Sequence, residues 1–295
     1  VGEVGAVGGR HPDQLAQATV DLLMDPVRLD RMGRNALHRM RATAWDNVAI
    51  AHARTFVRGT DTAAQLRFRW PPVTLSHLHR MTDRIGMVQF CDISEPDVRS
   101  GHTLDDNARA LIALCIHGGN QGGSDHEREL ASRYLDYIIH CQQPGGSFLN
   151  YADADGEFTQ QNHGENLDDS NGRALWALGV CVANEYMFPA DMARRARNAL
   201  EATLHWVGGS TSPRAIAFTI KGLYAYNHIQ HSARITVLID RLAARLQDTY
   251  NATTSPDWNW FEPILTYGNA VLPEAMLLAY LETQRPTYRE TAVAT

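Results

Sequence analysis

Residues 105–114 read DDNARALIAL, and residues 169–178 read DSNGRALWAL. Seven of the ten positions are identical, at an offset of 64 residues. Self-similarity at a fixed offset is typical of a repeated supersecondary unit. The aspartates that open each copy fit the preference for carboxylates near helix N-termini. The two stretches therefore predict that this part of the chain repeats one helical unit.

Further helical patterns continue this arrangement along the chain. They lie at residues 125–142 and 190–207, at a helix that opens at Ser212-Pro213, at about residues 232–249, and from Asn269 onward. Alternating helices suit an α/α toroid, in which inner helices line the axis and outer helices cover them. The predicted fold is all-α, with a number of helices that falls short of twelve, so an incomplete or open ring is expected. An Asp155-Gly156 turn predicts a small β-hairpin between two helices.

The first sixty residues form a separate unit in the sequence. Helical patterns cover residues 12–24, start again after Asp25-Pro26, and start once more at Trp45. Residues 1–60 carry 8 arginines against 6 acidic residues, whereas the remainder carries 19 basic against 27 acidic residues. We therefore predict two domains, a helical tail at 1–60 and the toroid at 61–295.

Composition excludes several classes of function. The net charge of -6 argues against a nucleic-acid partner, which usually requires a basic surface. The thirteen histidines are scattered without an HExxH pattern and no CxxC pair occurs, so neither a metal nor a cofactor is expected. Without a signal peptide or a run of about 18 apolar residues, we expect no membrane span and a cytoplasmic location.

Charged residues gather where the repeated helices begin. Asp105 and Asp169 each precede an arginine by four residues, Arg109 and Arg173, which predicts two ion pairs within helices. Arg214 repeats the pattern at the start of the third helix. Cations oppose the dipole at a helix N-terminus, so these arginines favour either a polar ring around a binding site or a structural ion-pair network. Both interpretations remain open.

Aromatic residues surround some of these carboxylates. Trp258, Trp260 and Tyr267 flank Glu262, and Tyr151 precedes the second cluster. Sugar sites combine flat rings with polar side chains, because sugar rings have apolar faces and polar edges. The WNWFE run at 258–262 therefore favours a sugar site, whereas Trp176, inside a repeated helix, is expected in the core.

A resemblance covers the N-terminal unit. Residues 13–56 resemble the closing helices of a GT-B glycosyltransferase of the retaining, family-4 type. The stretch that carries the resemblance reads LAQATVDLLMDPVRLDRMGRNALHRMRATAWDNVAIAHARTF. The nucleotide-sugar site of that family lies upstream of such helices. The resemblance therefore implies no catalytic residue in this segment.

A second resemblance covers about residues 83–280. The blocks DRIGMVQF, GHTLDDNARAL, NLDDSNGRALWALG, SPRAIAFTIKGL and WNWFEPILTYGNAVLPEAML resemble a bacterial helical domain appended to glycosyltransferases, similar in outline to six-hairpin glycosidases. It implies an oligosaccharide or polysaccharide partner, with a mannoside as one option, and a glycosyltransferase domain in cis. The positions that it singles out are Asp83, Gln89, Asp105, Asp106, Asn107, Arg109, Asp169, Arg173, Arg214, Glu262 and Asn269. The chain departs from the pattern at Phe90, where the resemblance implies a histidine.

Three functions follow as hypotheses. A glycosidase-like enzyme would use Asp106 and Glu262 as its two carboxylates, with Asp169 as an alternative. Glu262, among aromatic residues, is the preferred acid, whereas Asp105 and Asp169 are expected to be poorer acids because the arginine beside each lowers its pKa. A non-catalytic glycan-binding or scaffold domain is favoured by Phe90, and a protein-interaction solenoid would have no polar pocket. All sugar-related hypotheses require the helix starts to converge on a common basin.

Overall fold

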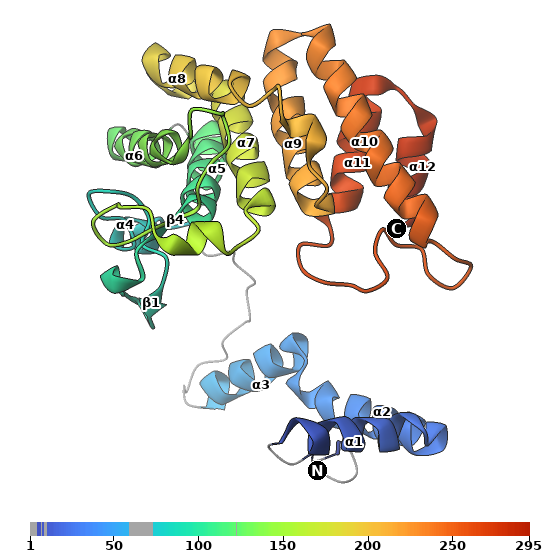
Figure 1. Cartoon of the computed structure of the whole chain (residues 1–295). Helices are drawn as coiled ribbons and strands as arrows, with labels where there is room; N and C mark the ends of the chain where they lie inside the picture. Colours follow the sequence, from blue (N-terminus) through green and yellow to red (C-terminus); the bar gives the residue numbers. More distant parts are fainter. Residues whose placement is uncertain (1–4, 7, 9–10, 59–72, 122) are drawn as a thin grey trace. The chain divides into compact units, whose positions relative to one another are not determined.

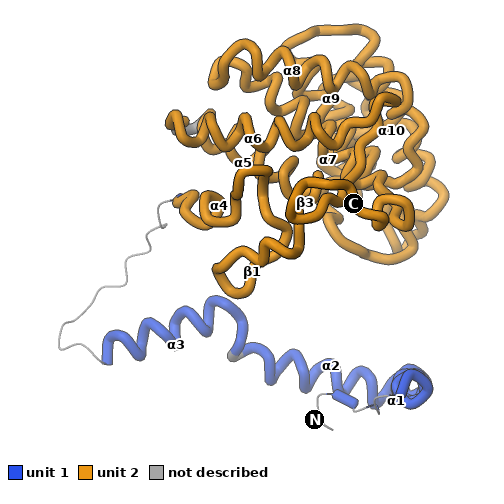
Figure 2. Tube along the Cα trace, turned by 60° about the vertical axis from the view of Figure 1, so that its left-hand side comes forward, with its two compact units in different colours: residues 1–73 blue, residues 74–295 orange. Residues whose placement is uncertain are grey.

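The computed structural model describes residues 5–6, 8, 11–58, 73–121 and 123–295. It divides into two compact units, Val1–Val73 and Thr74–Thr295 (Figure 2). We call them unit 1 and unit 2 and describe each by itself. The predicted boundary between residues 60 and 61 lies outside the described residues.

Unit 1 is helical, as the sequence predicts. It contains α1 (Pro12–Leu23), α2 (Pro26–Met40), a 3-10 turn (Arg41–Thr43) and α3 (Trp45–Arg58). Asp25 caps α2, because its carboxylate accepts a hydrogen bond from the backbone N–H of Arg28 at 2.9 Å. Among the described residues of this unit, Met32 and Ala53 are the buried apolar side chains, whereas Val27 and Trp45 are largely exposed.

Unit 2 consists of four consecutive helix pairs (Figure 1). The pairs are α5 (Leu104–Gln121) with α6 (Asp125–Cys141), α7 (Asp168–Ala183) with α8 (Ala190–Glu201), α9 (Pro213–Gln230) with α10 (Ala233–Thr253), and α11 (Val271–Thr283) with α12 (Pro286–Ala294). The first members contact one another in chain order, and each also packs against its own partner. The first members are therefore inner helices and the second members outer helices.

The predicted all-α toroid is confirmed, and the described helices make up part of a six-hairpin ring. A six-hairpin ring has twelve helices, whereas the described part of unit 2 has four inner and four outer ones, besides the short helix α4 (Ser76–Arg80). The inner helices start at the same end of the unit, which is the lower end in Figure 1. The residues at their N-termini are therefore brought to one end.

Two inner helices are in unusually close contact. A methyl group at Gly179 of α7 would overlap the carbonyl oxygen of Gly222 on α9, and one at Gly222 would overlap that of Leu175. Any larger side chain at these positions would push the two helices apart. The glycines thus set the separation of α7 and α9, and with it the separation of the residues at their N-termini.

The strands are short and lie beside the start of α5. β1 (Cys91–Asp92) pairs with β2 (Glu95–Pro96), and β3 (His102–Thr103) pairs with β4 (Tyr151–Ala152), both antiparallel. The predicted turn at Asp155-Gly156 exists, since a bridge joins Ala152 to Phe158 around it. However, β4 forms its ladder with β3 rather than within an isolated hairpin, because residues 102–103 offer backbone partners at the same place.

Candidate functional site

The start of α5 places two carboxylates against one arginine. Nη2 of Arg109 lies 2.6 Å from Oδ1 of Asp106 and 3.2 Å from Oδ2 of Asp105. The backbone N–H of Asp106 donates to the hydroxyl of Thr103, which in turn donates to the Asp106 carboxylate at 2.6 Å. The predicted ion pair between Asp105 and Arg109 is confirmed.

Asp105 lies between two arginines from two helices. Besides Arg109, Nη1 of Arg173 on α7 lies 2.9 Å from its Oδ1. Burial raises the pKa of Asp105, and this effect outweighs the opposing influence of Arg173 and Arg109. The expectation that adjacent arginines make Asp105 a poor acid is therefore wrong, because removal of its carboxylate from water is the larger effect.

Arg173 does not pair with Asp169, four residues before it. Asp169 instead accepts a hydrogen bond from the hydroxyl of Ser212 at 2.6 Å, at the start of α9. The predicted ion pair within α7 is wrong, because the partly buried carboxylate of Asp105 on α5 provides a partner for Arg173. The contacts from Asp105 to Arg173 and from Asp169 to Ser212 link the starts of three inner helices.

Arg214, at the start of α9, is buried and holds the segment that precedes α11. Its Nη1 and Nη2 each lie 2.8 Å from an oxygen of Glu262, and Nη2 lies 3.3 Å from Oδ1 of Asn269. It also donates to the hydroxyl of Thr266 and to the carbonyl oxygen of Tyr267. Glu262 thus has its own arginine, so the reason for preferring it as the acid does not hold.

Aromatic rings connect these two ionic clusters. The guanidinium of Arg173 lies 4.6 Å from the ring centre of Phe218 and 5.8 Å from that of Tyr267. The guanidinium of Arg214 lies 4.8 Å from the same Tyr267 ring, which is half exposed. These distances fall within the range of cation–π attraction. Tyr267 is therefore the exposed aromatic side chain that joins the arginines of α7 and α9.

Trp260 and Trp176 differ in burial from what the sequence predicts. Trp260 is 7% exposed and packs edge-on against Phe261, so it belongs to the core rather than to a sugar site. Trp258 is partly buried and donates to the carbonyl oxygen of Glu262 at 2.7 Å. Trp176, expected in the core, is partly exposed and stacks on Phe218 with ring centres 5.7 Å apart. Periodicity along one helix could not distinguish them, because neighbouring elements decide which rings are covered.

Asn107 and its repeat equivalent Asn171 have the same structural role. The side-chain oxygen of Asn171 accepts from the N–H of Phe148, and its amide donates to the Phe148 carbonyl. Asn107 makes the corresponding contacts with Met87 and is fully buried. The repeated asparagine thus fastens a preceding loop to each helix, which leaves Asn107 no exposed atom for the sugar contact that we predicted.

Three other predicted positions lie around β3 and β4. Asp83 accepts hydrogen bonds from two backbone N–H groups, those of Ile85 at 2.8 Å and Gly86 at 3.1 Å, and pairs with His102 at 3.0 Å. Burial acts to raise the pKa of Asp83, but these hydrogen bonds and His102 together lower it. Gln89 donates its backbone N–H to a neighbouring loop, and Tyr151 belongs to β4. These contacts fasten the strands to the start of α5.

The inner helices keep one face free of the outer helices. On α7 the partly exposed residues recur at i, i+4 and i+7, which is the spacing of one helix face. We call the set of these positions on α7 and the equivalent positions on the other inner helices the inner face; on α9, Arg214, Phe218 and Lys221 at these positions are buried. The inner face comprises Asp105, Arg109, Ala113 and Ile116 of α5, Asp169, Arg173, Trp176 and Val180 of α7, Arg214, Phe218, Lys221 and Ala225 of α9, and Glu274, Leu277 and Leu281 of α11.

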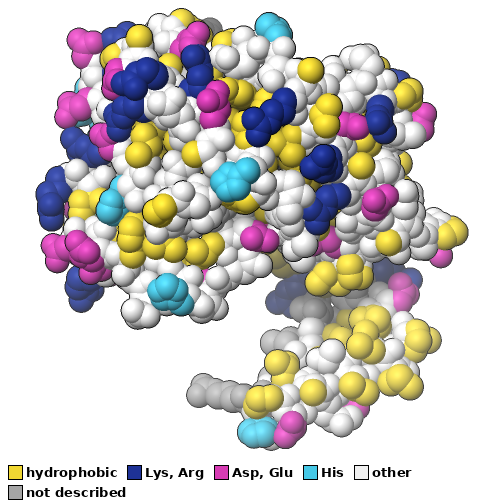
Figure 3. Space-filling view, turned by 45° about the horizontal axis from the view of Figure 1, so that its top comes forward, with side chains coloured by type: hydrophobic (Ala, Val, Ile, Leu, Met, Phe, Trp, Pro, Cys, Tyr) yellow, Lys and Arg dark blue, Asp and Glu magenta, His cyan; other side chains and the backbone are white. Residues whose placement is uncertain are grey.

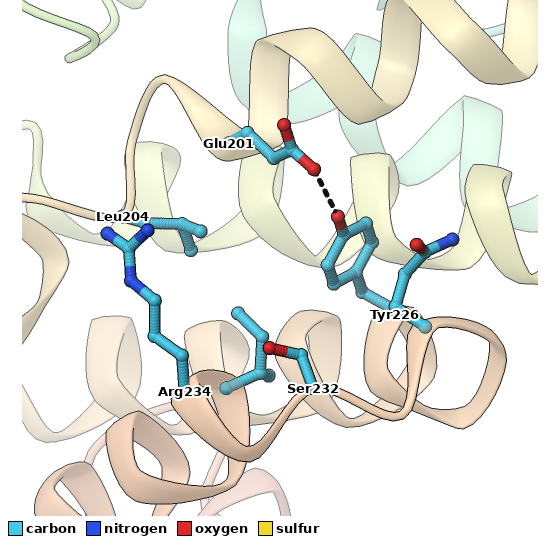
Figure 4. A pocket seen from close by; sticks show the side chains of 7 residues that line it. Glu201, Leu204, Tyr226, Ser232 and Arg234 are labelled. Atoms are coloured by element: carbon cyan, nitrogen blue, oxygen red, sulfur yellow. Dashed lines mark hydrogen bonds between the residues drawn. The ribbon is translucent and has the colours of Figure 1, made fainter.

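The predicted convergence of the helix starts is supported by this continuous set of contacts. Five cavities within the described residues, of about 300 to 460 Å³, have other linings. The one in Figure 4, of about 420 Å³, lies near the C-terminal end of α9, where the Tyr226 hydroxyl donates to Glu201 at 2.6 Å. Ser232 and Arg234 lie across it from Glu201.

The described residues give no support for a metal site or a membrane-spanning helix. The described residues contain no cluster of three or more histidine, cysteine, aspartate or glutamate side chains placed to hold a metal ion. Among the described helices, none combines the length and apolar character that crossing a bilayer requires. Basic and acidic side chains are interspersed on the face of unit 2 shown in Figure 3.

Comparison with known proteins supports the fold. No family model and no curated protein matches the chain. The structure of a sugar epimerase from a ruminal bacterium matches with a TM-score of 0.58 at 14% identity, covering 75% of this chain and 67% of the epimerase. At this identity the likeness shows the fold alone.

Two further structures match less well. A GH family 9 endoglucanase, J30, and its Zn-binding triple mutant each have a TM-score of 0.36 at 13% identity. Each match covers 72% of this chain, and the chain spans 59% of their length. These scores are too low to support an argument.

Proposed function

We propose that unit 2 binds a sugar chain on the inner face and that Asp105 transfers a proton to or from it. The observation that carries this proposal is the environment of Asp105, a partly buried carboxylate with a raised pKa between two arginines. Groups that exchange protons near neutral pH need a pKa shifted in this direction. The fold is shared with a sugar epimerase, and proton transfer on a sugar agrees with that likeness.

The second carboxylate of a glycosidase-like reaction would be Asp106. Because Nη2 of Arg109 contacts Oδ2 of Asp105 and Oδ1 of Asp106, these two oxygens lie no farther apart than the sum of the two contact distances. That limit is compatible with the separation of about 5–5.5 Å that retaining glycosidases use. Asp169 and Glu262 are less suitable, because neither shares an arginine with Asp105: Asp169 accepts a hydrogen bond from Ser212, and Glu262 pairs with Arg214. The proposed catalytic carboxylates are therefore Asp105 and Asp106, instead of the pair of Asp106 and Glu262 predicted from the sequence.

A non-catalytic glycan-binding domain is the second candidate. It is favoured by the engagement of Asp106, Asp169 and Glu262 in contacts within the protein, which would make the inner face a rigid polar surface. In both cases we retain the hypothesis that residues 13–56 end a glycosyltransferase domain that unit 2 serves in cis, in the cytoplasm. The exposed apolar side chains of unit 1, such as Val27 and Trp45, agree with helices that pack on a further domain.

Replacing one carboxylate distinguishes the two candidates. Asp105→Asn removes the proton but preserves the shape, and Asp191→Asn is its matched control, because Asp191 is an exposed carboxylate paired with an arginine on the outer helix α8. Both variants are tested for turnover and for calorimetric binding of gluco-, manno- and xylo-oligosaccharides. Turnover reduced by about 10²-fold or more in Asp105→Asn alone, with binding retained, supports the acid–base role. Binding without turnover in the unaltered protein supports the second candidate, and the absence of both refutes the proposal.

A further inference from the structure

The chain's single lysine, Lys221, lies on the inner face. The other 26 basic residues are arginines. The Lys221 side chain is 8% exposed, and its Nζ lies 3.9 Å from the ring centre of Trp176 and 2.6 Å from Oε2 of Glu274. An ammonium is a compact charge with three rotatable donors, whereas a guanidinium is a wide planar fork. The position between a ring face and one carboxylate oxygen suits the ammonium.

An unbroken series of contacts leads from Asp105 to this lysine. Arg173 pairs with Asp105 and lies over Phe218, and Phe218 stacks on Trp176. Trp176 in turn carries Lys221 on its ring face. Along the inner face, the contacts therefore lead from the ion pair at Asp105 through two aromatic rings to the ammonium of Lys221.

In the ion pair of Lys221 and Glu274, the Glu274 carboxylate is the partner that is exposed to solvent. The Glu274 side chain is 49% exposed, and Trp176 is partly exposed beside it. A pair whose carboxylate faces water contributes little to stability, whereas removing the ammonium from water has a cost. Stability alone therefore gives a weak reason for a buried lysine at this position.

The distance from Arg214 to Lys221 along α9 sets a minimum length for a ligand that contacts both residues. Lys221 follows Arg214 by seven residues of α9, which corresponds to about 10.5 Å along the axis. One pyranose ring is shorter than this. A ligand that contacts both the start of α9 and Lys221 must therefore contain more than one sugar unit.

We propose that Lys221 and Glu274 form a distal subsite for a second or third sugar unit of an oligosaccharide whose reacting unit lies at Asp105. Vicinal hydroxyls suit this pair, since one accepts a hydrogen bond from the ammonium while its neighbour donates to the carboxylate. The inference rests on the proposed function and specifies its substrate as an oligosaccharide rather than a monosaccharide.

The test uses the full chain and a ladder of gluco-, manno- and xylo-oligosaccharides of one to six units, with binding measured by calorimetry. Glu274→Gln removes the charge at an exposed position but keeps an oxygen that can accept from the Lys221 ammonium, and circular dichroism checks that the variant is folded. Lys221→Met removes the ammonium but keeps the stem, and Lys221→Arg keeps the charge with the wrong shape. Arg285→Met is the matched control, because it removes the 2.7 Å ion pair with Asp240 elsewhere in unit 2.

The expected result depends on ligand length. Glu274→Gln should weaken the binding of the longer members roughly tenfold, the size of a hydrogen bond to a charged group, and leave the shortest bound member unchanged. Lys221→Met and Lys221→Arg, once circular dichroism shows a native fold, should also weaken the binding of the longer members. Arg285→Met should leave the binding of every member unchanged. Equal binding of the whole ladder by Glu274→Gln and the unaltered protein would overturn the subsite while leaving the proposed function intact. No binding of any member by the unaltered protein would refute the proposed function itself.

Discussion

Removing the guanidinium of Arg214 should destabilise unit 2 strongly. The side chains of Arg214 and Glu262 are 5% and 18% exposed, and two hydrogen bonds of 2.8 Å join them. Arg214→Met leaves the Glu262 carboxylate buried without its cation. Breaking a buried pair from one side costs about 3–5 kcal/mol, because the remaining charge stays out of water. For a domain of this size that corresponds to a fall in Tm of roughly 6–20 °C.

Urea unfolding at pH 7, followed by circular dichroism and by tryptophan fluorescence, measures this effect. Trp258 donates to the Glu262 carbonyl, so the fluorescence also reports on the loosened segment before α11. The control is Arg194→Met, whose partner Asp191 is exposed, with an expected cost of at most about 1 kcal/mol. Combining Arg214→Met with Glu262→Leu should recover much of the loss, since two apolar residues replace a buried pair well. A loss below about 1 kcal/mol for Arg214→Met would show that the pair is not a structural element.

Three further predictions concern packing, loops and pH. Gly222→Ala should cost about 1–3 kcal/mol by forcing α7 and α9 apart, whereas Gly209→Ala, with open space around it, should be near neutral in the same denaturation assay. Asn171→Ala should cost about 1–3 kcal/mol per orphaned backbone group of Phe148, and the exchange of the Phe148 amide hydrogen should accelerate. Hydrogen bonds lower the pKa of Asp83 against the effect of burial, so its contribution to stability is present above the unfolded-state pKa and disappears as the pH falls through the lower folded-state value. Asp83→Asn should therefore be less stable than the unaltered protein at pH 7 and equally stable in strong acid, and an equal difference at both pH values would contradict this.

The sequence predicts the elements better than their partners. Local chemistry determines where helices begin, so Asp25 before α2 and Ser212 before α9 are both caps, as expected. The repeat identifies α5 and α7 as equivalent. Which side chain meets which across two helices is not predictable from one helix alone, and Arg173 therefore pairs with Asp105 rather than with Asp169.

The candidate site shows the same limit. The expected carboxylates and arginines do gather at the inner-helix starts, but burial of Trp260 and exposure of Trp176 depend on elements distant in the sequence. Sequence reasoning did not identify Phe218, Lys221 or Glu274 as part of the face. One available signal was that the chain uses a lysine once, inside a predicted helix, where arginine serves everywhere else.

The open row of helix pairs also bears on how such a domain can change its length. A closed ring fixes its circumference, so inserting one hairpin would strain every joint. Among the described helices, α5 and α11 each contact one inner neighbour. A row with such ends has no such restriction, because a hairpin gained or lost at an end leaves the remaining helix contacts unaltered. Length variants among homologues should therefore differ by whole hairpins at the two ends, while the glycine-spaced joint between α7 and α9 stays constant.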